Sequence, residues 1–339
     1  MTRVSDKSAP AAAVRAKAAL AAADGFLTPG LVATERHIRE LLGGDAPFIG
    51  ELLTYAAGAS GKRFRPKLTM LAAATCGVLP ERVADIAAAI ELIHLATLLH
   101  DDVIDESSTR RGRPAARRRF GNRLSILGGD YLITRVFQSL VTNVRDWRVF
   151  EIVLAAANRM VAGEFFEIWW ENRLDLSEEN YVQVITLKSA KLLEASCRAG
   201  AIAAGGGEIP SKALGEYGLN AGLSFQITDD WLDFTAGSDE LGKETFADVR
   251  DGKVTLPIIY GLSTPYGRAI TEAVEAIWDG AAEENALREL LGSSGALEMT
   301  RNTARRYAET GIKALTPVPP GEARDLLAAL ADWTWQRTY

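Results

Sequence analysis

The spacing of apolar residues along this chain predicts a protein built from helices. Apolar side chains recur every three or four positions, which places them on one face of an α-helix. The segments with this spacing are Leu31–Leu42, Arg82–Leu99, Leu124–Val144, Tyr181–Ala204 and Leu214–Phe234. Alternating runs rich in valine, isoleucine and threonine, which are typical of β-strands, are nearly absent. The pattern therefore predicts an all-α fold of roughly ten or more helices.

The residues that separate these helical segments indicate one domain. Glycine and proline separate the helical segments, but none of these positions resembles an interdomain linker, and no repeat of solenoid length is present. We therefore expect a single domain over residues 1–339. Residues 1–25 are rich in alanine and lack the dense apolar stretch and cleavage pattern of a secretory signal. They are predicted to form a frayed N-terminal helix of a cytoplasmic protein.

Composition excludes several classes of protein. The formal net charge of −6 disfavours a nucleic-acid partner. Two cysteines, Cys76 and Cys197, are too few for a disulfide scaffold and fit a reducing compartment. Stable membrane insertion is not expected either, because the longest apolar runs are interrupted by Asp85, Glu91 and His94.

Two aspartate-rich motifs carry the strongest chemical signal. Each follows an apolar helical run, and on a helix their first and last carboxylates lie on one face. The motifs are Asp101, Asp102 and Asp105, and Asp229, Asp230 and Asp233. Clustered carboxylates repel one another and are costly to desolvate, so a cation should compensate for them.

Magnesium fits these motifs best. It takes hard oxygen ligands, usually one or two carboxylates, and completes its octahedron with water and phosphate oxygens. One such motif alone could be a solvated helix end, but two copies make that interpretation unsatisfactory. A calcium-binding EF-hand is excluded, because neither motif has the glycine and terminal glutamate of that loop.

Basic residues occur in groups that could bind phosphate next to such a metal. Lys62 and Arg65 stand at the start of a helix whose first turn contains Pro66, where free backbone amides favour anions. Arg110 and Arg111 directly follow the first acidic motif. The remaining candidate cations are Lys188, Lys243 and Lys253. Each lysine taken alone would be interpreted as a solvated surface charge.

With these motifs in order, the chain from about Gly58 to Tyr260 resembles the trans-isoprenyl diphosphate synthases, the polyprenyl synthetase family. The likeness is greatest to medium- and long-chain bacterial members such as octaprenyl and decaprenyl diphosphate synthases. Both acidic motifs match, as do the basic segments around Lys62 and Arg110. The other matching pairs are Gly129-Asp130, Lys188-Ser189, Phe225-Gln226, Gly242-Lys243 and Gly252-Lys253.

The resemblance implies an isoprenoid synthase type I fold, a helical bundle around a central cavity, and a homodimer. It implies a trinuclear magnesium cluster on Asp101, Asp105 and Asp229, supported by Asp102, Asp230 and Asp233. The allylic diphosphate would be bound by Arg110, Lys188 and Lys243, with Lys253 as a further binding residue. Isopentenyl diphosphate would be bound by Lys62, Arg65, His94 and Arg111. Ser189 and Gln226 would line the reacting centre. Taken alone, His94 would be interpreted as a core histidine.

The implied reaction is ionisation of the allylic diphosphate, condensation with isopentenyl diphosphate, and loss of a proton. Product length would be set on the helix before Asp101, where Thr97, Ala96 and Ile93 are expected to face the cavity. A helical turn rises about 5.4 Å, comparable to one isoprene unit. Small residues at 96 and 97 favour a medium or long product.

One segment departs from the family pattern. Long-chain relatives usually carry Gly-Glu-x-x-Gln, whereas this chain has Gly163-Glu164-Phe165-Phe166-Glu167, followed by an aromatic cluster up to Trp170. The departure leaves a shorter product open, although we interpret the aromatic cluster as ordinary core packing.

Three alternatives remain. A class I terpene cyclase would share the fold but normally lacks the second aspartate motif. A non-catalytic subunit of a heteromeric synthase tends to lose acidic ligands. A generic phosphate-binding helical bundle leaves the repeated acidic pattern unexplained. We therefore expect a magnesium-dependent prenyltransferase.

Overall fold

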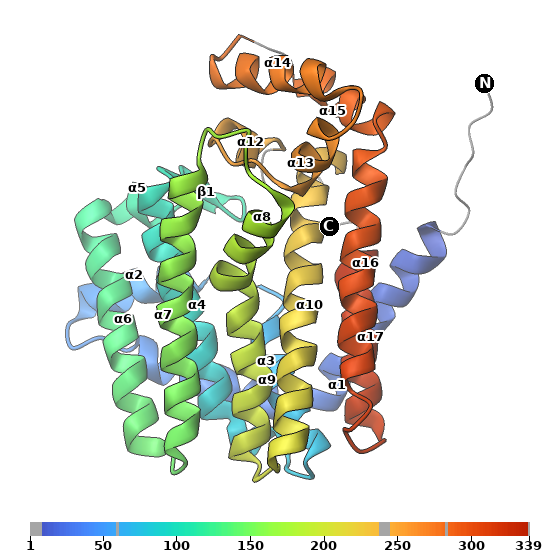
Figure 1. The fold of residues 1–339 in the computed structure, drawn as a ribbon. Coiled ribbons are helices and arrows are strands. Elements are labelled where there is room, and N and C mark those ends of the chain that lie inside the picture. The colour runs from blue at the N-terminus through green and yellow to red at the C-terminus, as the bar shows by residue number, and fades with distance from the viewer. Residues whose placement is uncertain (1–8, 59–60, 237–244, 282–283, 338–339) are drawn as a thin grey trace.

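Long helices run side by side in a bundle, with short helices across one end (Figure 1). The computed structural model describes residues 9–58, 61–236, 245–281 and 284–337, with side chains from residue 18 onward. The N-terminal elements are α1 (Ala9–Leu42), α2 (Pro47–Ala57), α3 (Phe64–Thr75), η1 (Pro80–Val83), α4 (Ala84–Ile104), α5 (Ala116–Phe120), α6 (Asn122–Asn143) and α7 (Trp147–Trp170). The later elements are α8 (Glu178–Ile185), η2 (Thr186–Ala190), α9 (Lys191–Ala203), α10 (Glu208–Thr235), α12 (Ala247–Arg250), α13 (Leu256–Leu262), α14 (Gly267–Trp278), α15 (Glu284–Ser293), α16 (Ala296–Ala314) and α17 (Glu322–Gln336). The helical content confirms the all-α fold class.

Two short strands form the β-structure within the described ranges. β1 (Thr109–Arg110) and β2 (Arg113–Pro114) pair antiparallel between α4 and α5. Arg111 and Gly112 form the connecting turn, and both have positive φ angles, of 52° and 72°. A two-residue turn of this kind matches the twist of the paired strands. The hairpin thereby fixes where Arg110 and Arg111 leave the backbone.

The N-terminal helix is longer than the periodicity predicted. It begins at Ala9 and continues through Pro29, whereas the apolar spacing indicated a start at Leu31. Ala23 and Leu27 are fully buried in a cluster with residues of α3, α10 and α17. The predicted frayed segment over residues 1–25 therefore does not reach Ala23. Tertiary packing and the high helix propensity of alanine outweigh the local cost of Pro29.

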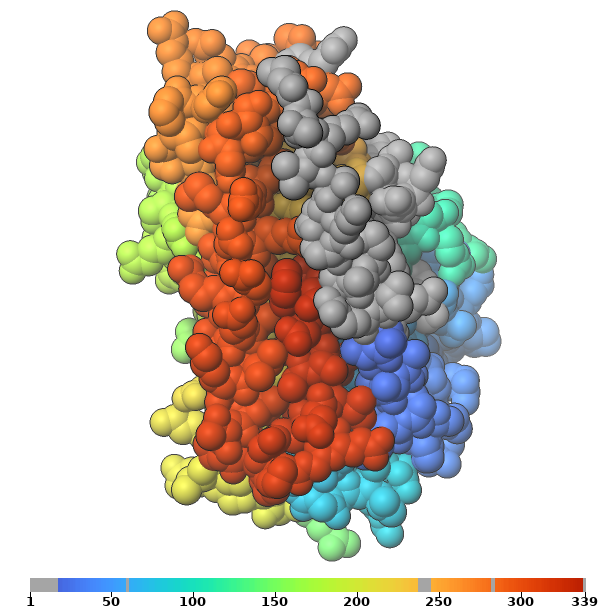
Figure 2. All heavy atoms as spheres, turned by 90° about the vertical axis from the view of Figure 1, so that its right-hand side faces the viewer, coloured from blue at the N-terminus to red at the C-terminus, as the bar shows by residue number. Residues whose placement is uncertain are grey.

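Three clusters of buried apolar side chains hold the bundle together. The first joins α1, α3, α10 and α17, and Figure 2 shows α16 and α17 alongside the described part of α1 on that face. The second joins α4, α6, α7 and α9, and the third joins α8, α10, α16 and the shorter helices α13 to α15. Each fully buried large side chain contributes roughly 1.5–3 kcal/mol. The helices that carry the acidic motifs are therefore anchored by the core.

Helix α4 illustrates how the core positions the site. Most of its residues are buried, including Ile90, Leu92 and Ile93, and its interior contains neither glycine nor proline. Together with η1 it forms the one described helical stretch, Pro80–Ile104, that is long and apolar enough to cross a membrane by length and composition. In an 18-residue apolar window of that stretch, 67% is buried inside the protein. Its apolar composition is therefore that of a core helix.

Candidate active site

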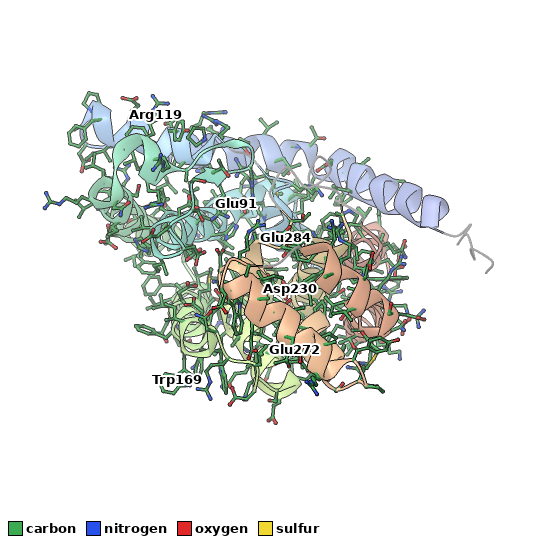
Figure 3. All side chains as sticks on the ribbon, turned by 90° about the horizontal axis from the view of Figure 1, so that it is seen from above. Glu91, Arg119, Trp169, Asp230, Glu272 and Glu284 are labelled. Atoms are coloured by element: carbon green, nitrogen blue, oxygen red, sulfur yellow. The ribbon has the colours of Figure 1, made fainter. Side chains whose placement is uncertain are left out.

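The two acidic motifs line a common chamber. Asp101 lies in the last turn of α4, Asp105 caps that helix, and Asp229 and Asp230 lie near the end of α10. Two adjoining cavities, of about 430 and 260 Å³, share Asp101 in their walls. Asp229 lines the larger cavity, whereas Asp105 and Asp230 line the smaller one. Seen from above, Asp230 lies in the middle of the bundle (Figure 3). The fold thus brings together motifs that are far apart in the sequence.

Two of the six predicted metal ligands lie outside this chamber. Asp102 is buried, and its Oδ1 accepts hydrogen bonds from Arg110 Nε at 2.9 Å and Nη2 at 2.5 Å. Asp233 is fully buried and lines neither cavity. Asp102 therefore orients Arg110, which itself lines both cavities. The central carboxylates are Asp101, Asp105, Asp229 and Asp230.

The chamber makes ionisation of two of these carboxyls costly. Burial raises the pKa of Asp101 to about 7, against the opposing charge of Lys188. Burial and the charge of Asp248 raise the pKa of Asp230 to about 8, although Tyr181 and Gln226 donate hydrogen bonds to it. A bound divalent cation would favour the ionised form of both groups. The converging hard oxygen donors fit Mg²⁺ in their chemistry.

A chain of hydrogen bonds connects the predicted reacting centre to the second motif. Ser189 Oγ donates to Gln226 Oε1 at 2.9 Å, and Gln226 Nε2 donates to Asp230 Oδ1 at 2.9 Å. Tyr181 donates its hydroxyl proton to the other oxygen of Asp230 at 2.5 Å. Ser189 and Gln226 line both cavities.

Basic residues also line the larger cavity. Arg65, His94 and Arg111 lie in its wall. A Cβ atom at Gly61 would stand 2.7 Å from Arg111 Nη1, so this guanidinium lies against the loop that precedes α3. Buried Arg65 Nε has no hydrogen-bond partner within the described part of the chain. An anion in this cavity would supply a hydrogen-bond acceptor for Arg65 Nε, which fits the predicted diphosphate subsite.

The environment of His94 makes it neutral. Burial and then the charge of Arg65 hold the pKa of His94 well below its ordinary value. A neutral imidazole offers a phosphate oxygen one N–H donor. Lys62 lies at the edge of this region, with its Nζ 5.1 Å from the centre of the Trp333 ring. Lys243 lies outside the described residues.

An irregular helical turn places Lys188 in the chamber. The periodicity predicted one helix over Tyr181–Ala204, but residues 186–190 form a π-helical turn between α8 and α9. Such turns often occur at functional sites, because they redirect side chains. A Cβ at Gly163 of α7 would clash with the backbone of Lys188, so glycine permits the close approach. Lys188 Nζ then lies 2.7 Å from Glu164 and also contacts Glu167.

Sequence analysis missed two residues that bind the acidic motifs. Arg337, just after α17, donates to Asp229 Oδ1 at 2.7 Å and to the carbonyl oxygen of Phe225. Its guanidinium carbon also lies 3.8 Å from the centre of the Phe225 ring. Tyr181 is the second, through its bond to Asp230. No local sequence pattern indicates either contact. Arg337 and Asp229 are 108 positions apart in the chain, and Tyr181 and Asp230 are 49 positions apart.

The predicted chain-length residues occupy two different environments. Thr97 lines the larger cavity, and Met160 of α7 lines the same cavity. Ala96 and Ile93 are fully buried in the core cluster of α4, α6, α7 and α9. Thr97 is therefore the predicted residue with direct access to a substrate chain.

The interpretation of the aromatic cluster as core packing was wrong. Phe165 is 72% exposed and Trp169 is 67% exposed. Figure 3 places Trp169 on the outer edge of the bundle. The spacing of these residues puts them on the outer face of α7, whereas Glu164 and Glu167 share the inner face. Trp170 is partly buried and lines the smaller cavity.

Comparison with known proteins identifies the family. The polyprenyl synthetase family matches residues 46–292. The octaprenyl diphosphate synthase of Escherichia coli K12 is 39% identical over 303 residues, covering 88% of this chain and 93% of that protein.

Solved structures are similar over nearly the whole chain. A polyprenyl synthase from Caulobacter crescentus CB15, in complex with calcium and isoprenyl diphosphate, has a TM-score of 0.88 at 35% identity, covering 94% of this chain and 98% of the other. A decaprenyl diphosphate synthase from Rhodobacter capsulatus has a TM-score of 0.86 at 37% identity, with the same coverage. These findings confirm the predicted enzyme class, a prenyltransferase. The chain belongs to the polyprenyl synthetase family.

Proposed function

We propose that the protein condenses an allylic diphosphate with isopentenyl diphosphate in a magnesium-dependent reaction and makes a medium- or long-chain all-trans polyprenyl diphosphate. The observation that carries this proposal is the shared chamber, in which Asp101 and Asp229 line one cavity of about 430 Å³ together with Arg65, Arg110 and Arg111. The octaprenyl and decaprenyl synthases among the relatives support the product class.

Asp101, Asp105 and Asp229 would hold the magnesium ions, and Asp230 would support them. Bound Mg²⁺ supplies electrostatic stabilisation of the negative charge that grows on the departing diphosphate. Arg110, Lys188 and Lys253 lie in the chamber walls and add positive charge to the same region. Asp102 keeps Arg110 oriented through the two hydrogen bonds described above.

The other substrate would bind beside α3 and α4. Arg65 and Arg111 would grip the diphosphate of isopentenyl diphosphate, with His94 donating an N–H and Lys62 closing the edge. Leu98, Ile104 and Met160 form apolar parts of the cavity wall. They would keep water away from a carbocation, which water would otherwise quench. We assign no side chain as general base, and the released diphosphate is the proposed proton acceptor.

A product assay tests the proposal. Purified protein incubated with Mg²⁺, farnesyl diphosphate and isopentenyl diphosphate should release diphosphate and form longer prenyl diphosphates, identified by mass spectrometry. A parallel sample with EDTA should form none. A folded protein that cyclises farnesyl diphosphate would support the terpene cyclase alternative. A folded protein that forms no product would refute the proposed function.

The basic edge of the chamber leads to a pH prediction. Burial, together with the charge of Arg337, lowers the pKa of Lys62 to about 8. Protonated Lys62 attracts the diphosphate and neutral Lys62 does not, so binding should weaken as the pH rises through 8. The KM for isopentenyl diphosphate should rise several-fold between pH 7 and pH 9, while Lys62→Arg should flatten this rise because arginine stays charged. Identical profiles for both proteins would exclude this role of Lys62.

The outer face of α6 and α7 supports the predicted homodimer. Large apolar side chains are exposed along both helices, namely Leu124, Leu127, Val141, Trp147, Leu154, Phe165 and Trp169. The two helices lie side by side (Figure 1). An exposed apolar area of this extent is typical of a surface that binds a protein partner. We propose that a second copy of the chain covers it.

We also place the enzyme in the cytoplasm. Cys76 and Cys197 are both free thiols, and Cys197 is buried in the core. Two free cysteines fit a reducing compartment.

A further inference from the structure

Glu167 occupies an unusual position between two lysines of the chamber. Its carboxylate contacts Lys188 and also lies 3.4 Å from Lys253 Nζ. Lys188 additionally pairs with Glu164, and Lys253 with Asp105 at 3.2 Å. Among the ion pairs of the described residues, Glu167 is the acid that contacts both lysines. It therefore connects the π-helical turn of Lys188 to the loop that carries Lys253.

The charges of this group are fixed at neutral pH. Burial opposes ionisation of Glu167, but Lys188 and Lys253 outweigh it and hold its pKa below the ordinary value. Each lysine in turn pairs with two carboxylates, Lys188 with Glu164 and Glu167 and Lys253 with Asp105 and Glu167, and such partners favour the charged ammonium form. Glu167 and the two lysines are thus charged in the metal-free protein.

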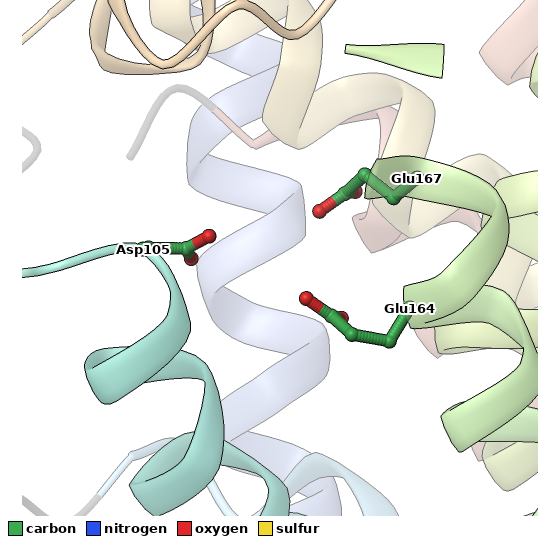
Figure 4. Close-up of side chains that lie close together, drawn as sticks. All are labelled: Asp105, Glu164 and Glu167. Carbon is green, nitrogen blue, oxygen red and sulfur yellow. The ribbon is translucent and has the colours of Figure 1, made fainter. Parts of the chain in front are cut away.

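Together with Glu164 and Asp105, these groups carry an excess of negative charge. Two lysines face three carboxylates, whose oxygens lie within 4.8 Å of one another. Figure 4 shows Asp105 on one side and Glu164 and Glu167 on the other, with their carboxylates pointing toward one another. Lysines that are neutralised in this way attract a diphosphate poorly, and the additional carboxylate repels it.

Metal binding reverses this balance. Under the proposed function, on which this inference rests, Asp105 becomes a magnesium ligand and the local charge turns positive. A glutamine at position 167 would leave two carboxylates for two lysines even without metal. The excess negative charge of the group is therefore that of Glu167.

We propose that Glu167 is a positioning residue that balances the charge of Lys188 and Lys253, so that diphosphate binds only after the metal. The role is electrostatic and acts through the two lysines. It imposes an order on binding in which a divalent ion precedes the allylic substrate.

Binding of inorganic diphosphate to metal-free protein tests this inference. Isothermal titration calorimetry in EDTA should detect weak binding by the wild type and about tenfold tighter binding by Glu167→Gln, since a unit charge within several ångströms is removed. Glu167→Asp keeps the charge and should bind as weakly as the wild type. Glu151→Gln is the matched control, because it removes an exposed carboxylate from the same helix. Saturating Mg²⁺ should reduce the difference between wild type and Glu167→Gln.

Kinetics provide a second readout. With Mg²⁺, Glu167→Gln should have a lower KM for farnesyl diphosphate at low metal concentration, with a smaller change in kcat. Glu167→Met also removes the charge and should reproduce the tighter binding of inorganic diphosphate to the metal-free protein. It serves as the second variant if Glu167→Gln folds poorly.

Two outcomes would overturn the inference. Unchanged or weaker metal-free binding in Glu167→Gln, in an enzyme whose wild type elongates substrates, would refute the role of Glu167 alone. Absence of diphosphate binding by the wild type with Mg²⁺, together with absence of elongation, would refute the proposed function as well.

Discussion

Replacing Asp101 with asparagine should abolish elongation and, at the same time, stabilise the metal-free protein. Asp101 lies in both cavities at the end of α4, where a carboxylate would bind the metal. Asparagine keeps the shape but offers no negative charge. We expect turnover to fall by roughly three orders of magnitude or more, which corresponds to about 4 kcal/mol of lost transition-state stabilisation.

The stabilisation follows from the pKa of Asp101, which burial raises from 3.8 to about 7. Between these two values the unfolded chain is ionised while the folded protein is still protonated, so stability falls as the pH rises. Above pH 7 the loss is complete. Asparagine does not ionise and avoids this cost, which we take as on the order of 1–3 kcal/mol.

Thermal unfolding in EDTA checks this prediction. The Tm of Asp101→Asn should exceed that of the wild type by a few degrees at pH 7, and the difference should shrink toward pH 4. Mg²⁺ should raise the Tm of the wild type more than that of the variant. Asp279→Asn, at an exposed position, is the control. A variant with normal turnover, or with a lower Tm at every pH, would contradict the assigned role and environment of Asp101.

Replacing Thr97 with phenylalanine should shorten the main product toward farnesyl or geranylgeranyl diphosphate. Thr97 lies in the wall of the larger cavity, one turn before Asp101, and Met160 lines the same cavity. A phenyl ring there would fill the space that a growing chain needs, about one isoprene unit per 5.4 Å helical turn. Mass spectrometry of products made from geranyl diphosphate measures the shift.

The matched control is Thr97→Ser, which keeps the hydroxyl that donates to the His94 carbonyl oxygen at 2.9 Å. Its product distribution should equal that of the wild type. Ala96→Phe is a poorer probe, because Ala96 is fully buried and a larger side chain would overpack the core at a cost of about 1–3 kcal/mol. A folded Thr97→Phe enzyme with unaltered products would show that another element limits the chain.

The sequence predicted the helices best where apolar periodicity and core packing agree. Leu124–Val144 was predicted and α6 spans Asn122–Asn143, because a single buried face governs that helix. The continuity of α1 was missed, since contacts of Ala23 and Leu27 with distant helices hold the predicted N-terminal helix and the Leu31–Leu42 segment in one helix through Pro29. Local propensity does not contain such contacts.

The candidate active site shows the same difference between features set by local sequence and features set by tertiary contacts. Asp101 and Asp229 were expected to share one cavity, because both acidic motifs match the polyprenyl synthetase family and that resemblance implies a common central cavity. The π-helical turn at Lys188 could not be predicted from the sequence, because it depends on the close approach of its backbone to α7 that Gly163 allows. Arg337 was missed for a related reason, because its partner Asp229 is 108 positions away. Residues whose role depends on tertiary contact lie beyond what spacing can indicate.

The contact between Arg337 and Asp229 also ties the second acidic motif to the docking of α17. Trp333 of that helix packs against the rings of Phe64 and Phe225. Arg337, directly after the helix, donates to Asp229 Oδ1 at 2.7 Å. Local unfolding of α17 would therefore remove both the guanidinium beside Asp229 and the aromatic support behind Phe225, so an intact substrate pocket depends on this helix staying docked.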